Sequence, residues 1–542
     1  MTSARIAQQR PDASRVRASA AARFGFGPPV RSEWVKFRSV RGWVIGMILA
    51  GVLIVFIGVF LAANGTISCQ NGPNSPALTG KQCLPPVPIG PGGEAVTDSF
   101  YFVHQPLAEN GSITIRVTSL TGTYTQGLAQ PGQAAPPAQK GLEPWAKAGI
   151  IIKASTKPGS AYAAMMVTGD HGVRMQYDYT GDIAGLPGRA SVTSPRWLRL
   201  TRSGDVVTGY DSADGTHWTL VGTARLAGLP ATVQAGMFAA TPAYHRVTSS
   251  FIGSSDIGGP ALATAVVDDV SLRGTWPASK WTTGSVGASR LAPETGRGGF
   301  AHAGNAYTVS GSGDIAPIVP GGRSSLPTAT IEGPLAGVFV GLIAVVIVAA
   351  MFFTAEYRRG LIRVTLAATP RRGQVLAAKA VVTGLVAFVV GLAASVLAVW
   401  LGLPKERAMG AYVLPVSTLT EVRVIVGTAA FVAIAAVLAV AIGAILRRSA
   451  AAVTTVIVAI ILPYLLSVTV LPTSVADWVL RLTPAAGLAI QQSIPNYPQV
   501  SSNASAIAGV FPLSPWPGFA VLCVYAAAAL AVAAVLLRRR DA

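Results

Sequence analysis

The sequence has few charged residues for its length. Of its 542 residues, 12% are Asp, Glu, Lys or Arg and 51% are hydrophobic, whereas about a quarter of the residues in ordinary soluble proteins are charged. This shortage excludes a typical soluble protein and indicates a membrane protein. The formal net charge of +19 does not indicate a nucleic-acid partner, because residues 64–334 hold 18 Lys and Arg against 16 Asp and Glu. The remaining excess lies in the N-terminal tail and beside apolar segments, where it marks membrane topology.

Motifs for catalysis and nucleotide binding are also missing. The sequence contains no G-x-x-x-x-G-K-[ST] motif, so we do not expect the chain to bind ATP through a P-loop. Its five histidines show no metal-ligand spacing, and no Ser/His/Asp signature is present. We therefore expect this chain to be no enzyme and to hold no catalytic residue, no metal and no cofactor of its own.

Six apolar runs are long enough to cross a bilayer, which takes about 20 residues. They cover residues 42–63, 335–353, 380–401, 424–446, 450–471 and 517–537. No Asp, Glu, Lys, Arg or His lies within these boundaries, although proton-driven transporters usually need an ionisable residue at membrane depth. If the chain transports a substrate, the energy must come from another polypeptide.

Four basic clusters orient the six runs. They precede the first run, fill residues 358–379, separate the fourth run from the fifth at Arg447 and Arg448, and follow the sixth run at 538–540. The positive-inside rule places all four in the cytoplasm of a plasma-membrane protein, with both termini inside and residues 64–334 outside. The first run follows a basic region too long for a cleaved signal peptide, so we expect it to remain as an anchor.

The region outside the membrane is predicted to be all-β. Short runs such as "ITIRVTSL", "GVRMQYDY" and "RWLRLTRSG" are rich in β-branched and aromatic residues and are separated by Gly, Pro, Asp and Ser. "DSADGTHW" places Asp214 and Gly215 at a hairpin tip. Strands in this number and spacing predict a sandwich or jelly roll, and residues 311–330 are interpreted as a linker back to the membrane.

Two cysteines of the outside region are candidates for a disulfide. Cys69 and Cys83 follow the first apolar run and lie in an oxidising compartment under this topology. A bridge between them would stabilise the fold by roughly 3 kcal/mol in the chain-entropy model. Two free thiols are the alternative, and Cys523 lies within the sixth run.

Aromatic and acidic residues of the outside region suggest few functional sites. Trp145, Trp197 and Trp218 could stack on a glycan or fill a sandwich core. Asp268 and Asp269 could form a carboxylate pair, but neighbours on a strand point to opposite faces, so we expect them not to converge.

Two cytoplasmic stretches resemble a known family. "TAEYRRGLIRVTLAATPRRGQVLAAK" (354–379) resembles the loop between the second and third helices of ABC-2-type transporter permeases, and "SEWVKFRSVRGW" (32–43) resembles their elbow helix. Leu361 departs from the family pattern, which often has Thr at that position. The loop residues that match the pattern are Glu356, Arg358, Gly360, Arg363, Leu366, Pro370, Arg372 and Lys379.

The resemblance implies a six-helix permease with an inserted outer domain. That domain resembles concanavalin-like jelly-roll modules of the DUF1349 type through stretches such as "EPWAKAGIIIKAS" and "VVDDVSL". The expected domains are a disordered tail (1–30), the elbow and first helix (31–63), the outer β-domain with linkers (64–330) and the remaining five helices (331–542).

By the same resemblance, residues 357–369 form a coupling helix that docks on a separate P-loop ATPase carrying ATP and Mg²⁺. A second permease chain and an exporter function are also implied. Glu33 or Lys36 could pair with Arg359 or Glu356. The implied coupling residues are Glu356, Tyr357, Arg358, Arg359, Gly360, Ile362, Arg363, Leu366, Pro370, Arg371 and Arg372, and the elbow residues are Glu33, Trp34 and Lys36.

Two alternatives stay open from the sequence. The segment 357–369 could be a basic turn that only fixes topology. The whole chain could be a membrane-anchored glycan-binding receptor or a cell-wall-acting enzyme, with its helices as a scaffold.

Overall fold

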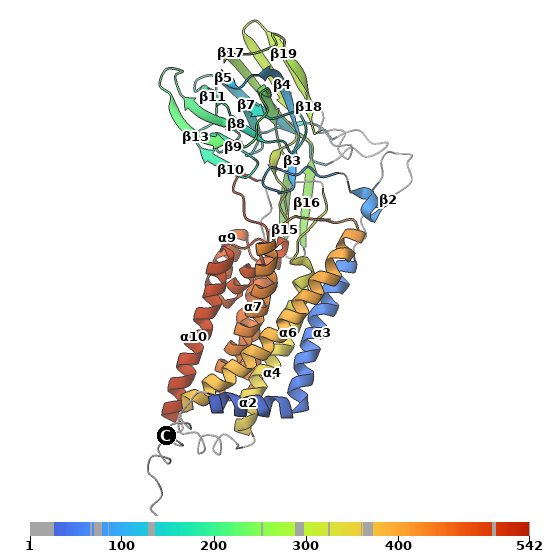
Figure 1. The fold of residues 1–542 in the computed structure, drawn as a ribbon, viewed down its shortest axis with the longest axis vertical. Coiled ribbons are helices and arrows are strands. Elements are labelled where there is room, and N and C mark those ends of the chain that lie inside the picture. Colours follow the sequence, from blue (N-terminus) through green and yellow to red (C-terminus); the bar gives the residue numbers. More distant parts are fainter. Residues whose placement is uncertain are drawn as a thin grey trace, which may run out of the picture.

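The computed structural model of the chain has two parts, a helical bundle and a β-domain (residues 86–322) that sits on one end of it (Figure 1). The C-terminus and α2 (Gly27–Ser39) lie at the opposite end of the bundle. The structure describes residues 27–64, 68–69, 78–84, 86–127, 136–250, 253–287, 298–322, 326–358, 360, 372–500 and 506–540.

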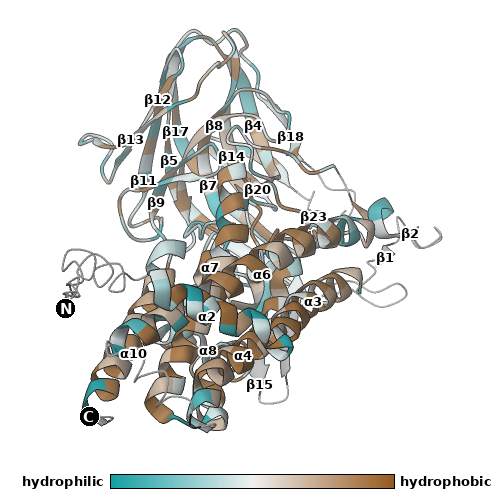
Figure 2. Cartoon of the chain, turned by 60° about the horizontal axis from the view of Figure 1, so that its bottom comes forward, coloured by the Kyte–Doolittle hydropathy of each residue, from teal (hydrophilic) through white to brown (hydrophobic). Residues whose placement is uncertain are grey.

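Six helices among the described residues are long and apolar enough to cross a membrane, which confirms the predicted number of spans. Their surfaces are hydrophobic along most of their length, whereas the β-domain is mixed (Figure 2). They are α3 (Arg41–Ala63), α4 (Val338–Arg358, preceded by the 3₁₀ turn η2, Gly333–Gly337), α6 (Arg372–Ala408), α7 (Thr418–Leu446), α8 (Ser449–Thr469) and α10 (Pro515–Arg540).

Helix α6 differs most from its predicted span. The apolar run at 380–401 lies inside a helix of 37 residues, which continues through charged residues at both ends. The helix therefore contains Lys379, which lies one residue before the predicted span and whose side chain is fully buried. Hydropathy placed the boundary at this charge, whereas the helix continues through it.

Close packing in the bundle depends on small residues. A Cβ on Gly58 of α3 would overlap the carbonyl oxygen of Pro334, and one on Gly337 would overlap the carbonyl oxygen of Ile54. These two glycines let the C-terminal end of α3 lie directly against η2, which is how helices commonly approach one another in membranes.

The segment between α8 and α10 folds back into the bundle, which the sequence did not predict. A short amphipathic helix, α9 (Thr473–Leu482), leads into a 3₁₀ stretch, η3 (Pro484–Gln491), and all eight residues of η3 are buried. This stretch packs against α7 and α10. Its sequence is apolar but far too short to register as a span.

The β-domain is a sandwich of two antiparallel sheets, as predicted. One sheet has the strand order β10 (Gly181–Ala184), β9 (Val173–Tyr177), β8 (Tyr162–Thr168), β7 (Lys147–Lys153), β14 (Val233–Ala240), β4 (Phe100–Leu107), β18 (Thr282–Val286). The other runs β13 (Thr219–Arg225), β12 (Val206–Ser212), β11 (Arg196–Ser203), β5 (Asn110–Tyr124), β17 (Ala261–Gly274), β20 (Ala306–Gly311), β19 (Gly299–Ala303), with β6 (Gln139–Lys140) beside β5.

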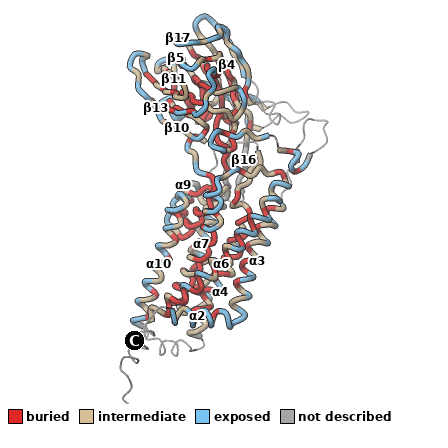
Figure 3. The backbone as a smooth tube through the Cα atoms, viewed as in Figure 1, coloured by how far each residue is buried: buried red, intermediate tan, exposed pale blue. Residues whose placement is uncertain are grey.

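The sandwich core follows from the alternation of the strands. In β5, Ile113, Ile115 and Val117 point inward and are fully buried, while their neighbours are partly exposed. Strands β7 and β8 are buried along their whole length, so this part of the sheet is covered on both faces (Figure 3). A hairpin of β15 (Tyr244–Ser250) and β16 (Gly253–Gly259) extends from the domain toward the bundle (Figure 1).

The region interpreted as a linker, 311–330, is largely built into the fold. Its strand β21 (Ile315–Pro317) pairs with β3 (Val96–Asp98), and β22 (Thr328–Ala329) forms a parallel pair with β23 (Tyr412–Val413), which lies between α6 and α7. The segments that enter and leave the β-domain therefore run side by side.

A small apolar core holds the β-domain on the bundle. We name it the docking core, and its buried members are Ala95, Ile318, Val319, Leu414 and Ile494. Leu414 follows β23 and Ile494 follows η3, whereas the other three come from the entry and exit segments of the β-domain. The two parts of the chain thus share one hydrophobic contact.

Candidate functional site at the end of the bundle opposite the β-domain

Three helices meet at the end of the bundle away from the β-domain. Helix α2 lies across this end, where α4 finishes and α6 begins (Figure 1). The chain between the ends of α4 and α6 is the basic stretch singled out in the sequence. Its position between two helix ends makes their contacts the natural place to look for a functional site.

Four charged residues from these three helices form one ion-pair network, which we call the junction cluster. Lys379 Nζ of α6 lies 2.6 Å from Glu33 Oε2 of α2 and 2.7 Å from Glu356 Oε1 of α4. Lys36 Nζ of α2 lies 2.7 Å from Glu33 Oε1 and 3.3 Å from Glu356 Oε1. Two acids and two bases balance each other, and the pairing expected between the elbow helix and Glu356 is confirmed for Lys36.

The junction cluster is largely shielded from water. The side chains of Lys379 and Glu33 are 0% and 2% exposed, while that of Lys36 is 40% exposed. A buried charge is tolerated only when it is paired, and removal of one partner typically costs about 3–5 kcal/mol. Burial lowers the pKa of Lys36, but its hydrogen bond and ion pair with Glu33, followed by those with Glu356, outweigh this and raise the pKa above its usual value.

Aromatic rings surround the cluster. Lys379 Nζ lies 4.5 Å from the ring centre of Phe352, which in turn meets Phe37 of α2 edge-on at 5.3 Å. One turn further along α4, Tyr357 lies under the guanidinium of Arg447, 4.9 Å away. Because Arg447 caps α7, the turn between α7 and α8 also contacts the end of α4. Four helices are therefore linked at this point.

A second polar layer lies at the other end of the bundle, near the β-domain. Arg423 Nη2 donates to the carbonyl oxygen of Gln492 at 2.8 Å, and Gln491 Nε2 donates to Thr428 Oγ1 at 3.2 Å. Glu332 Oε1 accepts from the backbone N–H of Ser493, and burial raises the pKa of Glu332. These contacts fix the end of η3 to α7 and to the start of the second span.

Comparison with known families identifies the family of this chain. Residues 121–542 match the family described as ABC-2 family transporter protein. The chain belongs to this family. It is a multi-pass membrane protein of the permease type with an additional β-rich domain, as the stretches at 32–43 and 354–379 indicated. No curated protein matches the ABC-2 chain at a significant level.

Several solved structures resemble part of this ABC-2 permease. A protein of unknown function from Saccharomyces cerevisiae is 16% identical, covers 40% of this chain and 88% of its own, and has a TM-score of 0.22. Scytalido-glutamic peptidase with a transition-state analog inhibitor is 9% identical, covers 41% and 100%, and also scores 0.22. Peanut lectin with a 9-residue peptide is 10% identical, covers 39% and 100%, and scores 0.16. At these scores none of them carries an argument about function.

The implied coupling residues of the permease lie on both sides of the junction cluster. Glu356 and Tyr357 belong to the last turn of α4, Arg358 ends it, and Gly360 has a left-handed backbone with φ of 65°. Arg372 begins α6 and donates to the carbonyl oxygen of Leu537 at 3.0 Å. The others, Arg359, Ile362, Arg363, Leu366, Pro370 and Arg371, lie outside the described residues, as does most of the predicted helix 357–369.

The elbow residues are divided between the two faces of α2. Glu33 and Lys36 face the cluster, while Trp34 is 42% exposed. Helix α2 begins at Gly27, so it includes the last residues of the segment expected to be disordered, and residues 1–26 lie outside the described part of the chain. The sequence pattern had pointed to Lys379 only as part of a family motif. Its partnership with Glu33 was not predicted, because 346 positions separate the two residues.

The three candidate tryptophans of the β-domain are all in contact with other side chains. Trp145 is buried and stacks on His171 at 3.9 Å. Trp197 lies between the guanidinium of Arg116 and the backbone of Gly215, and the guanidinium of Arg199 lies 3.7 Å from the ring centre of Trp218. A role in glycan contact stays a prediction.

The acidic pair is arranged differently from the expectation. A β-bulge interrupts β17 at Asp268, and Asp269 has a left-handed backbone with φ of 49°. Both carboxylates consequently reach the same partner, with Arg116 Nε 2.7 Å from Asp268 and 3.2 Å from Asp269. The prediction that they point to opposite faces is therefore wrong, because strict alternation fails at a bulge. They form a structural ion pair with an arginine.

The described cysteines agree with the predicted disulfide. Cys83 ends η1 (Gly80–Cys83) and is disulfide-bonded, whereas Cys523 is a free thiol. Strand β1 (Ser68–Cys69) pairs with β2 (Leu78–Thr79), which directly precedes η1. Cys69 is the remaining cysteine of the sequence.

Proposed function

We propose that this ABC-2 permease is the membrane subunit of an exporter driven by a separate P-loop ATPase, which docks on residues 357–369. Two permease chains and two ATPase chains would form the working transporter. The ATP and Mg²⁺ belong to the ATPase, and the permease responds by a shift between inward-open and outward-open states.

The observation that supports this proposal best is the junction cluster. Glu356 and Lys379 stand on either side of the basic segment and are ion-paired to each other and to α2. A partner that displaced this segment would act on α4, α6 and the elbow helix together, since their buried charges share the same network. A turn that only fixed topology would need no such network.

The arrangement of the basic residues supports the proposed orientation. Helix α2, the turn at Arg447 and the C-terminal end of α10 all lie at the end of the bundle away from the β-domain (Figure 1). By the positive-inside rule this end faces the cytoplasm of the plasma membrane, and the β-domain is extracytoplasmic. The disulfide at Cys83 suits an oxidising compartment.

The test is copurification of the ATPase with tagged full-length variants from the native membrane. Ile362→Asp and Leu366→Asp should lose the ATPase, because an unpaired charge in an interface costs roughly 2–5 kcal/mol. Both changes lie outside the membrane spans, so expression and insertion should be normal. Val192→Asp, at an exposed apolar position of the β-domain, is the matched control. If both segment variants keep the ATPase and its activity, the segment is a charged turn and the proposal fails.

The receptor or cell-wall enzyme alternative has less support. Its best candidates were the three tryptophans, and each of them already stacks on an Arg or His side chain of the β-domain. No group of three or more His, Cys, Asp or Glu residues suited to a metal ion occurs within the described ranges.

A further inference from the structure

A hollow of about 630 Å³ lies between the first and third spans. Its walls come from α3 between Ile48 and Ala63, and from α6 between Val390 and Leu401, and every lining residue is apolar. Small residues at Gly51, Ala393 and Ala394 create the space, which we name the α3–α6 groove. It occupies the half of both helices nearer to the β-domain.

The α3–α6 groove opens toward the bilayer. Phe56 and Phe60 on α3 and Leu397 on α6 line it and remain about half exposed, at 61%, 54% and 45%. Both walls belong to spanning helices, so the surroundings at this depth are hydrocarbon. The occupant must therefore be a lipid chain or another membrane helix.

The dimensions of the groove favour a lipid chain. Its lining on α3 extends over 15 residue steps, which is about 22 Å of helix. The volume of about 630 Å³ is therefore drawn out along the two helices, which is the shape of an extended chain. A single extended hydrocarbon chain would fit.

Positive charge at one end of the groove indicates that the headgroup of the lipid is anionic. Lys405 lies four residues beyond Leu401, on the same face of α6 and one turn closer to the β-domain. It is exposed, and no ion pair within the described part of the chain holds it. Lys81 is exposed in η1, whose Gly80 packs against the last turn of α6 at Ala408. A phosphate placed just above the groove would meet these amines.

We infer that the α3–α6 groove binds one acyl chain of an anionic phospholipid from the leaflet on the β-domain side, with its phosphate held by Lys405. This site is separate from the junction cluster and from the proposed ATPase contact. It does not depend on whether the chain is an exporter.

The test uses the purified full-length chain in nanodiscs that contain a phosphatidylglycerol or a phosphatidylcholine with a photoactivatable diazirine on one acyl chain. Cross-linked peptides are located by mass spectrometry. With phosphatidylglycerol, labelling should concentrate in residues 48–63 and 390–401 and exceed that of α10, whose outward face is also apolar. With phosphatidylcholine the same peptides should be labelled more weakly.

Two pairs of variants separate the groove from the headgroup contact. Ala393→Phe should fill the groove and reduce labelling to the level of α10 with either lipid, whereas Ala527→Phe on the exposed face of α10 should leave it unchanged. Lys405→Gln should lower labelling by phosphatidylglycerol about five-fold, as expected for one basic side chain at a lipid surface. Arg407→Gln is its control, because a residue two positions on faces another side of the helix.

Each contrary result overturns the inference. Equal labelling of α3, α6 and α10 would mean that only bulk lipid covers the groove. Cross-links between two copies of the chain at α3 and α6, in place of lipid, would make the groove a subunit interface. Unchanged labelling in Lys405→Gln would remove the anionic headgroup from the assignment.

Discussion

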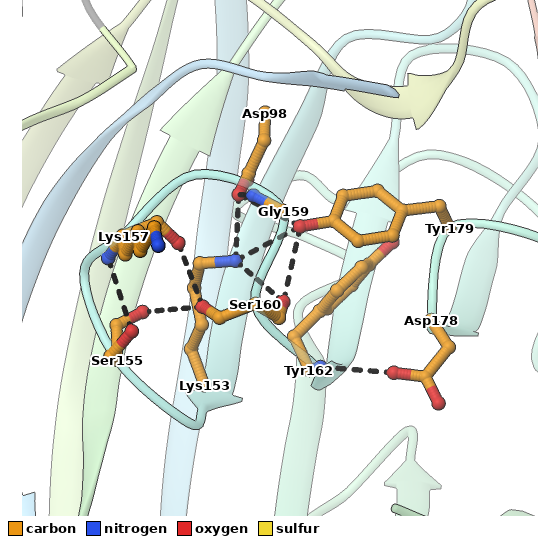
Figure 4. A network of polar contacts seen from close by, with 9 residues as sticks. All are labelled: Asp98, Lys153, Ser155, Lys157, Gly159, Ser160, Tyr162, Asp178 and Tyr179. Carbon is orange, nitrogen blue, oxygen red and sulfur yellow. Dashed lines mark hydrogen bonds and ion pairs between the residues drawn. The ribbon is translucent and has the colours of Figure 1, made fainter. Parts of the chain in front are cut away.

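Lys153 of the β-domain and Lys379 of the bundle are both fully buried, but they are paired in different ways. Lys153 of the β-domain binds one carboxylate, Asp98, at 2.7 Å, together with the carbonyl oxygen of Ser160 at 2.9 Å and the hydroxyl of Tyr179 at 3.1 Å (Figure 4). Lys379 of the bundle binds two carboxylates from two other helices, and these carboxylates are shared with Lys36. The contact in the β-domain is a closed pair of one lysine and one carboxylate. The junction cluster has a second lysine that also pairs with both carboxylates.

The difference reflects which elements each contact joins. Asp98 ends β3, the strand that brings the chain into the β-domain, so its pair with Lys153 fixes the entry segment to the sheet. Burial lowers the pKa of Lys153, and the pair with Asp98 opposes this. In the bundle the shared network joins three helices beside a segment that we propose to be pushed by a partner. A network with a spare base can keep its charges balanced while one helix shifts.

The largest effect of a single substitution on stability is expected for Lys153→Met, which removes the lysine of the closed pair and leaves its carboxylate. Asp98 would then be buried without a counter-charge, at a cost of about 3–5 kcal/mol. Thermal unfolding of the purified full chain should show the β-domain melting at a clearly lower temperature. Lys157→Met, at an exposed position of the neighbouring loop, should not change it.

The double variant Asp98→Asn/Lys153→Met sharpens this prediction. It removes both charges and should recover a large part of the lost stability, because the penalty comes from the unpaired carboxylate. If the double variant is as unstable as Lys153→Met, the loss is one of packing and the comparison of the two lysines loses its basis.

A smaller loss of stability is expected for Lys379→Met. Lys36 can still bind both Glu33 and Glu356, so the cost should fall at or below the lower end of the range of about 3–5 kcal/mol. Thermal unfolding of the bundle measures it, with Arg407→Met, at an exposed position of the same helix, as control. The combination Lys36→Met/Lys379→Met should cost more than the two single changes together, since it leaves both carboxylates unpaired. Simple additivity would show that the two lysines act independently.

Another contact, weaker than these two ion pairs, joins the bundle part of the chain to the β-domain. Gln499, which is 2% exposed and lies between η3 and α10, donates from Nε2 to the carbonyl oxygens of Thr180 at 3.1 Å and Tyr179 at 3.5 Å. Gln499→Ala should loosen the loop at 178–180 by about 1–3 kcal/mol, the usual cost of a buried polar group left without its partner. Hydrogen exchange of that loop in the full chain should become faster, and Gln139→Ala, at an exposed position, should have no effect there. If the hydrogen exchange of the loop does not change, the docking core holds the β-domain on the bundle without help from Gln499.

The smallest effect is expected at the exposed hairpin between β12 and β13. The hydrogen bond and the ion pair with Asp214 raise the pKa of His217, and the hydrogen bonds from His217 and from the backbone N–H groups of His217 and Thr216 lower the pKa of Asp214. The histidine contributes order that is fully present below its ordinary pKa of 6.5 and is lost as the pH rises through the raised value. The aspartate contributes order that is present above 3.8 and is lost as the pH falls through the lowered value.

The hairpin should therefore be best ordered between about pH 4 and pH 6.5. Amide exchange of Thr216 and His217, corrected for its intrinsic pH dependence, should be slower at pH 5 than at pH 8. In His217→Phe the difference between the two pH values should vanish. If it persists there, another group controls the hairpin.

The sequence was sufficient for the features that arise from local patterns. Apolar runs of about 20 residues predicted all six spans, and Asp214-Gly215 predicted a turn that the structure forms with Gly215 at φ of 80°. The β-sandwich followed from alternating strands. Each of these depends on residues close together in the chain.

The features that were missed depend on contacts between distant residues or on local irregularity. Glu33 and Lys379 are joined only after the helices pack, so no spacing rule could link them. A bulge turned Asp268 and Asp269 to the same arginine, against the two-residue period of a regular strand. Eight buried residues in η3 were too few to look like a span. All four residues of the junction cluster were named from the sequence, and the pair between Lys36 and Glu356 was expected. The two ion pairs of Lys379 were not expected.

The length of α6 links the two ends of this transporter subunit. An α-helix of 37 residues is about 55 Å long, well beyond the roughly 30 Å of hydrocarbon in a bilayer. It carries Lys379 near one end and leads into β23, beside the exit strand of the β-domain, at the other. Its one internal proline, Pro404, lies in the last turns and leaves the middle unbroken. A rod of this length that tilts by about 10° around its centre moves its ends about 5 Å in opposite directions. A displacement of α6 at the junction cluster would therefore move the other end of the helix sideways beneath the β-domain, on the far side of the membrane.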